Sequence, residues 1–178
     1  MRDHFQYRSP SLSDSQALAE LGRDTFIETF GHLYQTEDLE SFLSQKYTRE
    51  IIERQLADPS IRHQVVEEDG ELIAFIKIGP LDLPVSSPPS KASEIKQLYV
   101  RKSFGGMGIG RGLMSWAFEQ MEANGIENIY LSVFSENHRA IRFYQRFGFT
   151  KCGDYHYPVG KHLDLEWIMQ LPLSSIEL

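Results

Sequence analysis

The fold can be inferred from two adjacent stretches, EIKQLYV (residues 94–100) and RKSFGGMGIGRGLM (residues 101–114). The first is rich in β-branched and aromatic residues, which predicts a strand. The second contains five glycines, and apolar residues then recur at helical spacing, which predicts a loop leading into a helix. The first N–H groups of a helix have no partner within it. A strand, a glycine-rich loop and a helix in this order therefore form an anion site, above all for phosphate.

Two common phosphate-binding loops do not fit this stretch. A nucleoside-triphosphate loop ends in Gly-Lys-Ser/Thr, whereas Gly110 is followed here by Arg111 and Gly112. The dinucleotide fingerprint G-x-G-x-x-G fails in both registers, because its third glycine would fall on Arg111 or Leu113. A helix start that is glycine-rich without binding anything stays open as an alternative.

The loop resembles the acyl-CoA signature of the GNAT-type N-acetyltransferases, Arg/Gln-x-x-Gly-x-Gly/Ala. Gly108 and Gly110 occupy its two glycine positions, and Leu98-Tyr99-Val100 resembles the end of the strand that precedes it. The chain departs from the family where Gly105 replaces the usual Arg or Gln, and where Lys102 replaces a common Pro.

A second motif follows, Asn137-x-x-Ala140-x-x-Phe143-Tyr144-x-x-x-Gly148-Phe149, and it resembles the other GNAT motif at the expected distance. The two motifs together cover about residues 94–149. They imply an α/β GNAT fold, with a mixed, mostly antiparallel central sheet of about seven strands flanked by helices. We expect residues 1–178 to form this single domain. Residues 26–30 and the tail with Tyr157, Gly160 and Trp167 further resemble the bacterial spermidine/spermine acetyltransferase branch.

Periodicity places the other elements. Asp69-Gly70 is a strong hairpin signal between two apolar runs. The second run, residues 71–79, is apolar on both faces, which predicts an interior strand. We expect strands over residues 5–8, 62–68, 71–79, 128–133, from 149 onward and 163–171, and helices after Ser13, Thr36, Thr48 and Asn137.

The resemblance implies that acetyl-CoA is the co-substrate and that backbone groups of the first motif hold it. Gly105 offers no side chain to the pyrophosphate, and Lys102 and Arg111 are the candidates to replace that contact. The residues expected to bind the coenzyme are Leu98, Tyr99, Val100, Gly106, Met107, Gly108, Ile109, Gly110, Arg111, Asn137 and Tyr144.

Acetyl transfer to an amine requires a proton acceptor and a proton donor. An aliphatic amine has a pKa near the lysine reference of about 10.4, so a base must first remove a proton, directly or through water. Glu94 matches the position of a catalytic glutamate in several GNAT enzymes, and an exposed strand-edge acid is the alternative. Tyr144 matches the family tyrosine near the coenzyme sulfur, and a core tyrosine is the alternative.

The acceptor is less constrained. In this family the first helices cover the acceptor site, and here they carry Glu28, Phe30 and Tyr34 among other acidic and aromatic residues. Such a set suits a small cationic amine such as a polyamine, and a solvated helix face is the alternative. A protein N-terminus or lysine is a rival acceptor, and an acyl-CoA-binding sensor without turnover is a rival of another class.

Composition narrows the remaining classes. The net charge of −7 disfavours nucleic-acid binding and favours the approach of a cation, although such a charge also serves solubility. The six histidines and single Cys152 show no metal-ligand spacing. No apolar run is long enough for a membrane helix, and residues 1–10 lack a signal core. We therefore expect a cytoplasmic protein without a metal, whether it works as a monomer or a homodimer.

Overall fold

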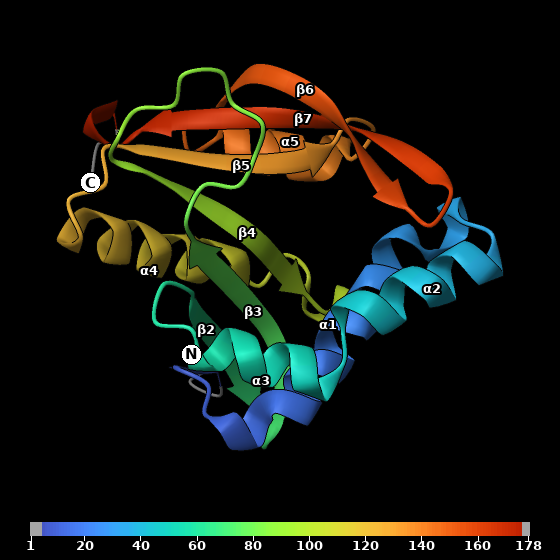
Figure 1. Cartoon of the computed structure of the whole chain (residues 1–178). Helices are drawn as coiled ribbons and strands as arrows, with labels where there is room; N and C mark the ends of the chain where they lie inside the picture. Colours follow the sequence, from blue (N-terminus) through green and yellow to red (C-terminus); the bar gives the residue numbers. More distant parts are fainter. Residues whose placement is uncertain (1–4, 176–178) are drawn as a thin grey trace.

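The computed structural model describes residues 5–175, which form one seven-stranded sheet in the order β1-β2-β3-β4-β5-β7-β6, flanked by helices (Figure 1). Neighbouring strands are antiparallel except β4 and β5, which are parallel. The predicted mixed, mostly antiparallel sheet is thus confirmed. The strands are β1 (Gln6–Arg8), β2 (Arg62–Glu68), β3 (Glu71–Gly79), β4 (Ala92–Val100), β5 (Asn128–Phe134), β6 (Thr150–Val159) and β7 (His162–Pro172). The helices are α1 (Ser15–Phe30), α2 (Thr36–Lys46), α3 (Arg49–Ala57), α4 (Ile109–Ala123) and α5 (His138–Gln145).

The two faces of the sheet bury different helices. Apolar residues of α1 and α3 pack on β2 and β3 on one face, with Leu18 and Ile52 against Phe75. Apolar residues of α4 and α5 pack on the other face, where Leu113 joins a cluster that includes Met169 of β7. β3 contributes to both clusters and is an interior strand, as its two-sided apolar pattern predicts. Within residues 5–175, no helix combines the length and apolar character that crossing a membrane requires.

β4 and β5 separate along their length, and this separation creates the site. Their parallel pairing covers only residues 92–95 of β4 and 128–131 of β5. On its other edge, β4 shifts register against β3, so that Ile95 and Gln97 pair with consecutive β3 residues and Lys96 is the extra residue of a bulge. A bulge bends a strand and increases its twist. β4 therefore turns away from β5, and Figure 1 shows the two strands diverging as a V.

The hairpin between β6 and β7 closes the open end of this V. Val159, at the end of β6, is buried among aromatic residues of α1 and α2, including Phe26 and Phe42. The backbone N–H of Lys161 in the hairpin turn donates to Asp38 of α2 at 2.9 Å. Figure 1 shows the tip of the hairpin reaching α2. The helices that follow β1 and the last hairpin of the chain thus meet across the opening.

Candidate active site

The glycine-rich loop has the geometry of an anion site. Gly106 and Gly108 both have φ of +84°, and Gly108 immediately precedes α4. The first helical hydrogen bond runs from the N–H of Gly112 to the carbonyl of Gly108, at 3.1 Å. The N–H groups of residues 109–111 therefore lie at the positive end of the helix, ahead of that bond. A Cβ at Gly106 or Gly108 would meet no protein atom within 4 Å, so the space beside the loop is free for a ligand.

Arg139 lies beside Gly105, the position at which the family signature has Arg or Gln and this chain has no side chain. A Cβ built on Gly105 would lie 3.0 Å from Nη2 of Arg139, which is exposed in the first turn of α5. α5 also contacts the loop through Phe143, whose ring would be 3.3 Å from a Cβ on Gly110. The sequence candidates for the missing contact, Lys102 and Arg111, do not include this residue. It stands inside the second motif, and its position beside the first motif follows from the packing of α5.

The free edge of β4 presents backbone donors to the V. The N–H of Arg101 donates to the carbonyl of Ile73 on β3, at 2.9 Å. Peptide groups alternate in direction along a strand, so the N–H groups of Leu98 and Val100 point away from β3, toward the gap left by β5. The side chain of Tyr99 packs against Phe75 on the face of the sheet that α1 and α3 cover, with ring centroids 5.7 Å apart. The backbone N–H of Tyr99 alternates with those of Leu98 and Val100 and therefore points toward β3, so the assignment of Tyr99 to the coenzyme stays a prediction.

Tyr144 and Asn137 both belong to α5. Asn137 caps the helix, because its Oδ1 accepts the N–H of Ala140 at 3.2 Å. Tyr144 is 9% exposed and packs against Phe149. Burial raises the pKa of Tyr144, and the nearby Glu166 acts in the same direction. A tyrosine with a raised pKa stays protonated at neutral pH and keeps a proton to donate.

Glu94 is 8% exposed, so it is no exposed edge acid. Its Oε2 accepts the backbone N–H of Asp82 at 2.8 Å and lies 3.3 Å from the ammonium of Lys96. Lys96 in turn lies 2.6 Å from Oδ2 of Asp82. The carboxylate thereby fastens the loop after β3 to the bulged part of β4. Its assignment as the base stays a prediction.

The structure does not bring the three predicted acceptor residues together. Phe30 and Tyr34 contact the strands beside the V: Phe30 packs edge-on against Phe134 of β5, with ring centroids 6.2 Å apart, and the hydroxyl of Tyr34 donates to Asp164 of β7. Glu28 instead accepts the backbone N–H of Lys102 at 3.0 Å and so holds the start of the glycine-rich loop.

Two acids that the sequence reasoning did not single out converge near Tyr34. Asp164 is 4% exposed. Glu166, two residues along β7, is paired in register with Phe134 of β5 and Tyr155 of β6. Burial and the charge of Asp164 raise the pKa of Glu166 to about 7, against the effect of a hydrogen bond from Ser132. The sequence does contain a signal for this pair, because Asp164 and Glu166 occupy alternate positions in the predicted strand over residues 163–171, which is otherwise mostly apolar.

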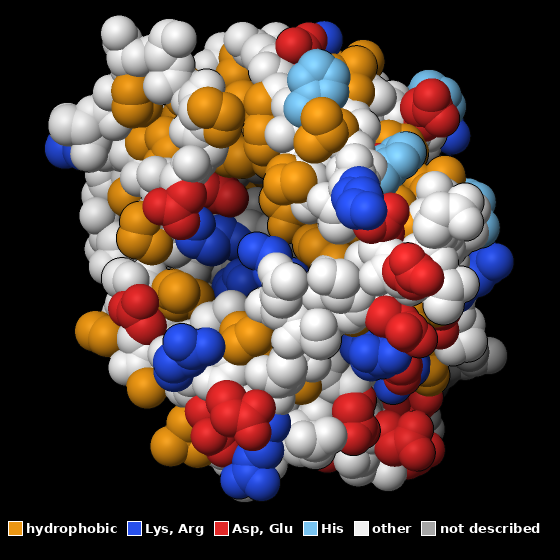
Figure 2. All heavy atoms as spheres, turned by 45° about the vertical axis from the view of Figure 1, so that its right-hand side comes forward, with side chains coloured by type: hydrophobic (Ala, Val, Ile, Leu, Met, Phe, Trp, Pro, Cys, Tyr) orange, Lys and Arg blue, Asp and Glu red, His pale blue; other side chains and the backbone are white. Residues whose placement is uncertain are grey.

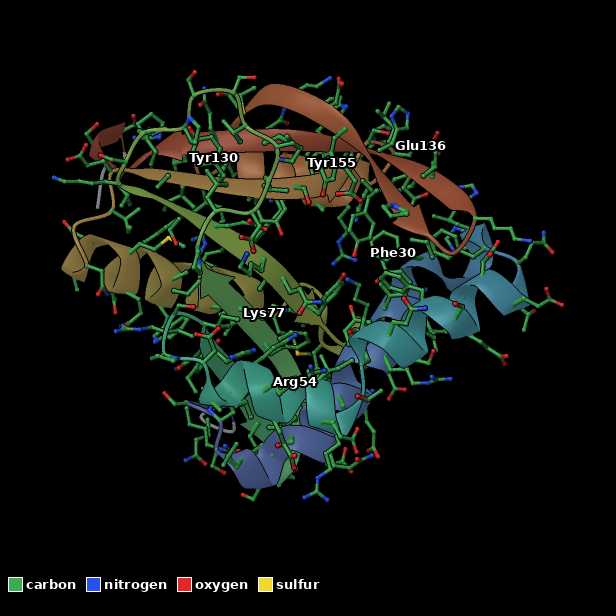
Figure 3. All side chains as sticks on the ribbon, viewed as in Figure 1. Phe30, Arg54, Lys77, Tyr130, Glu136 and Tyr155 are labelled. Atoms are coloured by element: carbon green, nitrogen blue, oxygen red, sulfur yellow. The ribbon has the colours of Figure 1, made fainter. Side chains whose placement is uncertain are left out.

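Figure 2 shows a hollow on the face that carries the open end of the V, with hydrophobic, acidic and basic side chains around it. In Figure 3, Phe30 at the end of α1 and Tyr155 on β6 lie on opposite sides of the opening, and Lys77 lies on β3. Burial, followed by the charges of Lys96 and Lys46, lowers the pKa of Lys77 to about 8. The described residues near the V thus include a group of lysines as well as the acidic pair.

The site contains three kinds of group: main-chain donors suited to a phosphorylated ligand, a buried phenol, and carboxylates across the gap. These groups can bind a ligand and transfer protons without forming a covalent intermediate. Cys152 lies on β6, and partial desolvation raises the pKa of its thiol, which disfavours the nucleophilic thiolate. Among residues 5–175, no group of three or more His, Cys, Asp or Glu side chains is arranged to bind a metal ion.

Comparisons with known proteins agree with this geometry. A model described as the acetyltransferase (GNAT) family matches residues 19–149. The chain is 25% identical over 163 residues to an uncharacterised N-acetyltransferase of Lactobacillus delbrueckii subsp. lactis, covering 92% of this chain and 94% of that protein. It is 26% identical over 149 residues to the spermidine N(1)-acetyltransferase of Thermoplasma acidophilum, covering 82% and 88% respectively.

Among solved structures, the PaiA N-acetyltransferase of Thermoplasma acidophilum in complex with coenzyme A matches with a TM-score of 0.77 at 23% identity. The match covers 94% of this chain and 98% of that chain. The family model spans most of the sequence, including both motifs and the loop between β4 and α4. The protein therefore belongs to the GNAT family of acetyltransferases and is an enzyme that uses acetyl-CoA as its acyl donor.

Proposed function

We propose that this enzyme transfers the acetyl group of acetyl-CoA directly to the nitrogen of a small cationic primary amine, of which polyamines are the leading class. The observation that carries the proposal is the acidic pair Asp164 and Glu166 beside Tyr34, Tyr155 and Tyr157, at the end of the V that the β6–β7 hairpin closes. Carboxylates and aromatic rings together favour ammonium groups. The similarity to a spermidine acetyltransferase supports the same class.

In this proposal, backbone groups and side chains both bind acetyl-CoA. The N–H groups at the start of α4 and the free space at Gly106 and Gly108 suit the pyrophosphate. We assign Arg139 the contact that a side chain at Gly105 would otherwise make. The N–H groups of Leu98 and Val100 suit the pantetheine arm and can polarise the thioester oxygen. Met107, 44% exposed, and Asn137 complete the predicted binding set.

Tyr144 is the proposed proton donor to the departing thiolate. It is buried on α5, and its raised pKa keeps it protonated in the neutral range. For the proton acceptor, the prediction from sequence is Glu94, acting directly or through water. Much of the rate would come from holding the amine beside the thioester in a fixed orientation.

The β6–β7 hairpin across the open end of the V favours a small acceptor over a protein. A polypeptide acceptor needs an open groove, and here the hairpin turn is fastened to α2 by Asp38 and packed through Val159. Phe30 of α1 also packs edge-on against Phe134 of β5, with ring centroids 6.2 Å apart, which joins α1 to the other side of the V. Acetylation of a protein N-terminus or lysine is therefore the weaker candidate.

A second candidate acceptor is an amine that also carries a carboxylate. Lys77 is partly buried, and its pKa is lowered by burial and by Lys96 and Lys46. A negative group of the acceptor would relieve this repulsion. Lys77 also lies 3.3 Å from Gln55 Oε1, a neutral partner.

A panel of amines tests these proposals, with release of free coenzyme A thiol as the readout. Spermidine, putrescine and propylamine represent the cationic class, β-alanine represents the carboxylate-bearing class, and a peptide with a free N-terminus represents protein acceptors. We expect spermidine or putrescine to give the highest kcat/KM. Preference for β-alanine would favour the second candidate. Binding of acetyl-CoA without turnover of any acceptor would favour a sensor and overturn the proposal.

A further inference from the structure

We propose that Glu166 is the carboxylate that takes the proton from the acceptor ammonium. This inference rests on the proposed acetylation of an amine and deepens it. Neither GNAT motif contains Glu166, since it lies on β7, the last strand of the chain. Its place in the site comes from the strand order, in which β7 is inserted between β5 and β6.

The register places Glu166 on the acceptor face of the sheet. Residues directly opposite each other in paired strands share a face. Glu166 is opposite Phe134 and Tyr155, and Glu94 of β4 is opposite Tyr130 of β5. Tyr130 and Phe134 are four residues apart on β5, and residues at even spacing on a strand share a face. Glu94 and Glu166 therefore point to the same side of the sheet, the side that carries Phe30.

Groups from several elements lie close enough to Glu166 for its charge to act on them. Tyr155 and Tyr157 of β6, Tyr34 after α1, Tyr99 of β4 and Tyr144 of α5 each feel its charge. Ser132 of β5 lowers the pKa of Glu166, and Asp164 of β7 is the charged neighbour that raises it. Tyrosines supply hydroxyls without a positive charge, and Asp164 repels a second negative charge. This environment makes Glu166 a proton acceptor that releases its proton easily near neutral pH.

The position relative to Tyr144 also suits the role. The proposed proton donor, Tyr144, comes from the face covered by α5, whereas Glu166 is on the acceptor face, and the charge of Glu166 still reaches the phenol. A reacting nitrogen and thioester placed between them would have an acid on one side and a base on the other. Glu94, by contrast, has one carboxylate oxygen shared by the N–H of Asp82 and the ammonium of Lys96.

The step balances as follows. The ammonium of the acceptor loses one proton to Glu166, and its lone pair forms the C–N bond to the acetyl carbon. As the C–S bond breaks, the sulfur takes a proton from Tyr144, and a second proton leaves the nitrogen. That second proton restores Tyr144 through solvent, and Glu166 releases its own proton to solvent. One proton is released for each amide and each free thiol formed.

The test compares pH profiles of kcat/KM for the best amine of the panel, with full-length Glu166→Gln, Glu166→Asp and wild type. For wild type, we expect activity to be lost as the pH falls through the region of pH 7, because a protonated Glu166 cannot accept a proton. Glu166→Gln should remove this limb and lower kcat/KM at pH 7.5 by roughly 100-fold or more. Glu166→Asp should be slower than wild type and keep the limb.

Three further variants separate a catalytic from a structural role. Asp164→Asn should move the limb to lower pH, because it removes the charge that disfavours ionised Glu166. Glu119→Gln, an exposed carboxylate on α4, is the control for a change of one charge and should match wild type. With an aminooxy analogue of the amine, whose nitrogen is already neutral at pH 7, the loss in Glu166→Gln should be roughly tenfold smaller. A purely structural defect would slow both acceptors equally.

The opposite pattern would overturn the inference. If Glu166→Gln kept the acidic limb, or if Glu94→Gln removed it instead, Glu94 or another group would be the base while the proposed function stood. If wild type acetylated no amine of the panel, the proposed function itself would fail, and this inference with it. Thermal unfolding of each variant verifies folding, and Glu166→Gln should gain stability over wild type as the pH rises from about 5 to above 7, where ionised Glu166 is buried.

Discussion

Replacement of Arg139 by Ala should weaken coenzyme binding if Arg139 makes the contact that we assign to it beside Gly105. Its Nη2 is 3.0 Å from the position of a Cβ on Gly105. A hydrogen bond to a charged group contributes about 1.5–3 kcal/mol. Arg139 is exposed, so we expect the lower end of that range. A loss of about 1.5 kcal/mol corresponds to roughly a tenfold rise in Kd.

Calorimetric titration with coenzyme A and with dephospho-coenzyme A tests this assignment. Both ligands contain the pyrophosphate, and only the first carries the 3′-phosphate. Arg139→Ala should therefore weaken both by the same factor. Arg54→Ala is the matched control, because it removes the same charge from an exposed position on α3, which packs on the other face of the sheet from α4. A loss confined to coenzyme A would show that Arg139 holds the 3′-phosphate and would refute the reasoning.

A compensating substitution makes the test sharper. Gly105 has φ of −62° and ψ of 136°, which any residue adopts. In wild type, a Cβ there would meet Arg139 at 3.0 Å and the carbonyl of Lys102 at 3.2 Å. In Arg139→Ala the first contact disappears. We thus expect Gly105→Arg to restore affinity in the Arg139→Ala background and to give no gain in wild type. An unchanged Kd in Arg139→Ala would refute the reasoning outright.

Three other outcomes follow from the site. Tyr144→Phe should lower kcat by roughly 100-fold or more with little change in the Kd of coenzyme A; a large loss of affinity would make it a packing residue. Gly108→Val should abolish coenzyme binding in calorimetry. It should also reduce the free energy of unfolding by about 1–2 kcal/mol, since a β-branched residue is strained at φ of +84°. Unaltered affinity would count against the loop as the binding site of the pyrophosphate. Gly160→Ala would place its Cβ 2.3 Å from Asp38 Oδ1, so it should loosen the hairpin and raise KM for the amine while KM for acetyl-CoA stays constant. Equal changes in both KM values would argue for a general defect in folding.

Much of the architecture is local and was therefore accessible from the sequence. The hairpin at Asp69-Gly70 forms with both residues at positive φ, as that dipeptide favours. The two-sided apolar pattern of residues 71–79 is that of an interior strand. The glycine positions fix the backbone of the loop, and helix α4 begins directly after Gly108. These features depend on contacts between residues close in the chain, which periodicity and turn chemistry encode directly.

The composition of the acceptor side depends on strand order and register instead. Glu166 joins Phe134 and Tyr155 because β7 lies between β5 and β6, and a shift of one residue would turn it to the other face. Its raised pKa comes from burial, a property of the assembled sheet. Glu28 was assigned to the acceptor from its helix, yet the fold turns it toward the loop.

The same distinction separates the two halves of the coenzyme site that we propose. The main-chain donors of the loop follow from glycines written next to one another between a strand and a helix. The guanidinium beside Gly105 comes from Arg139, 34 positions further along, and only the docking of α5 on the loop brings the two together. A short-range pattern can specify a backbone conformation, because sterics act between neighbours. Which distant side chain fills the space beside it is settled by packing.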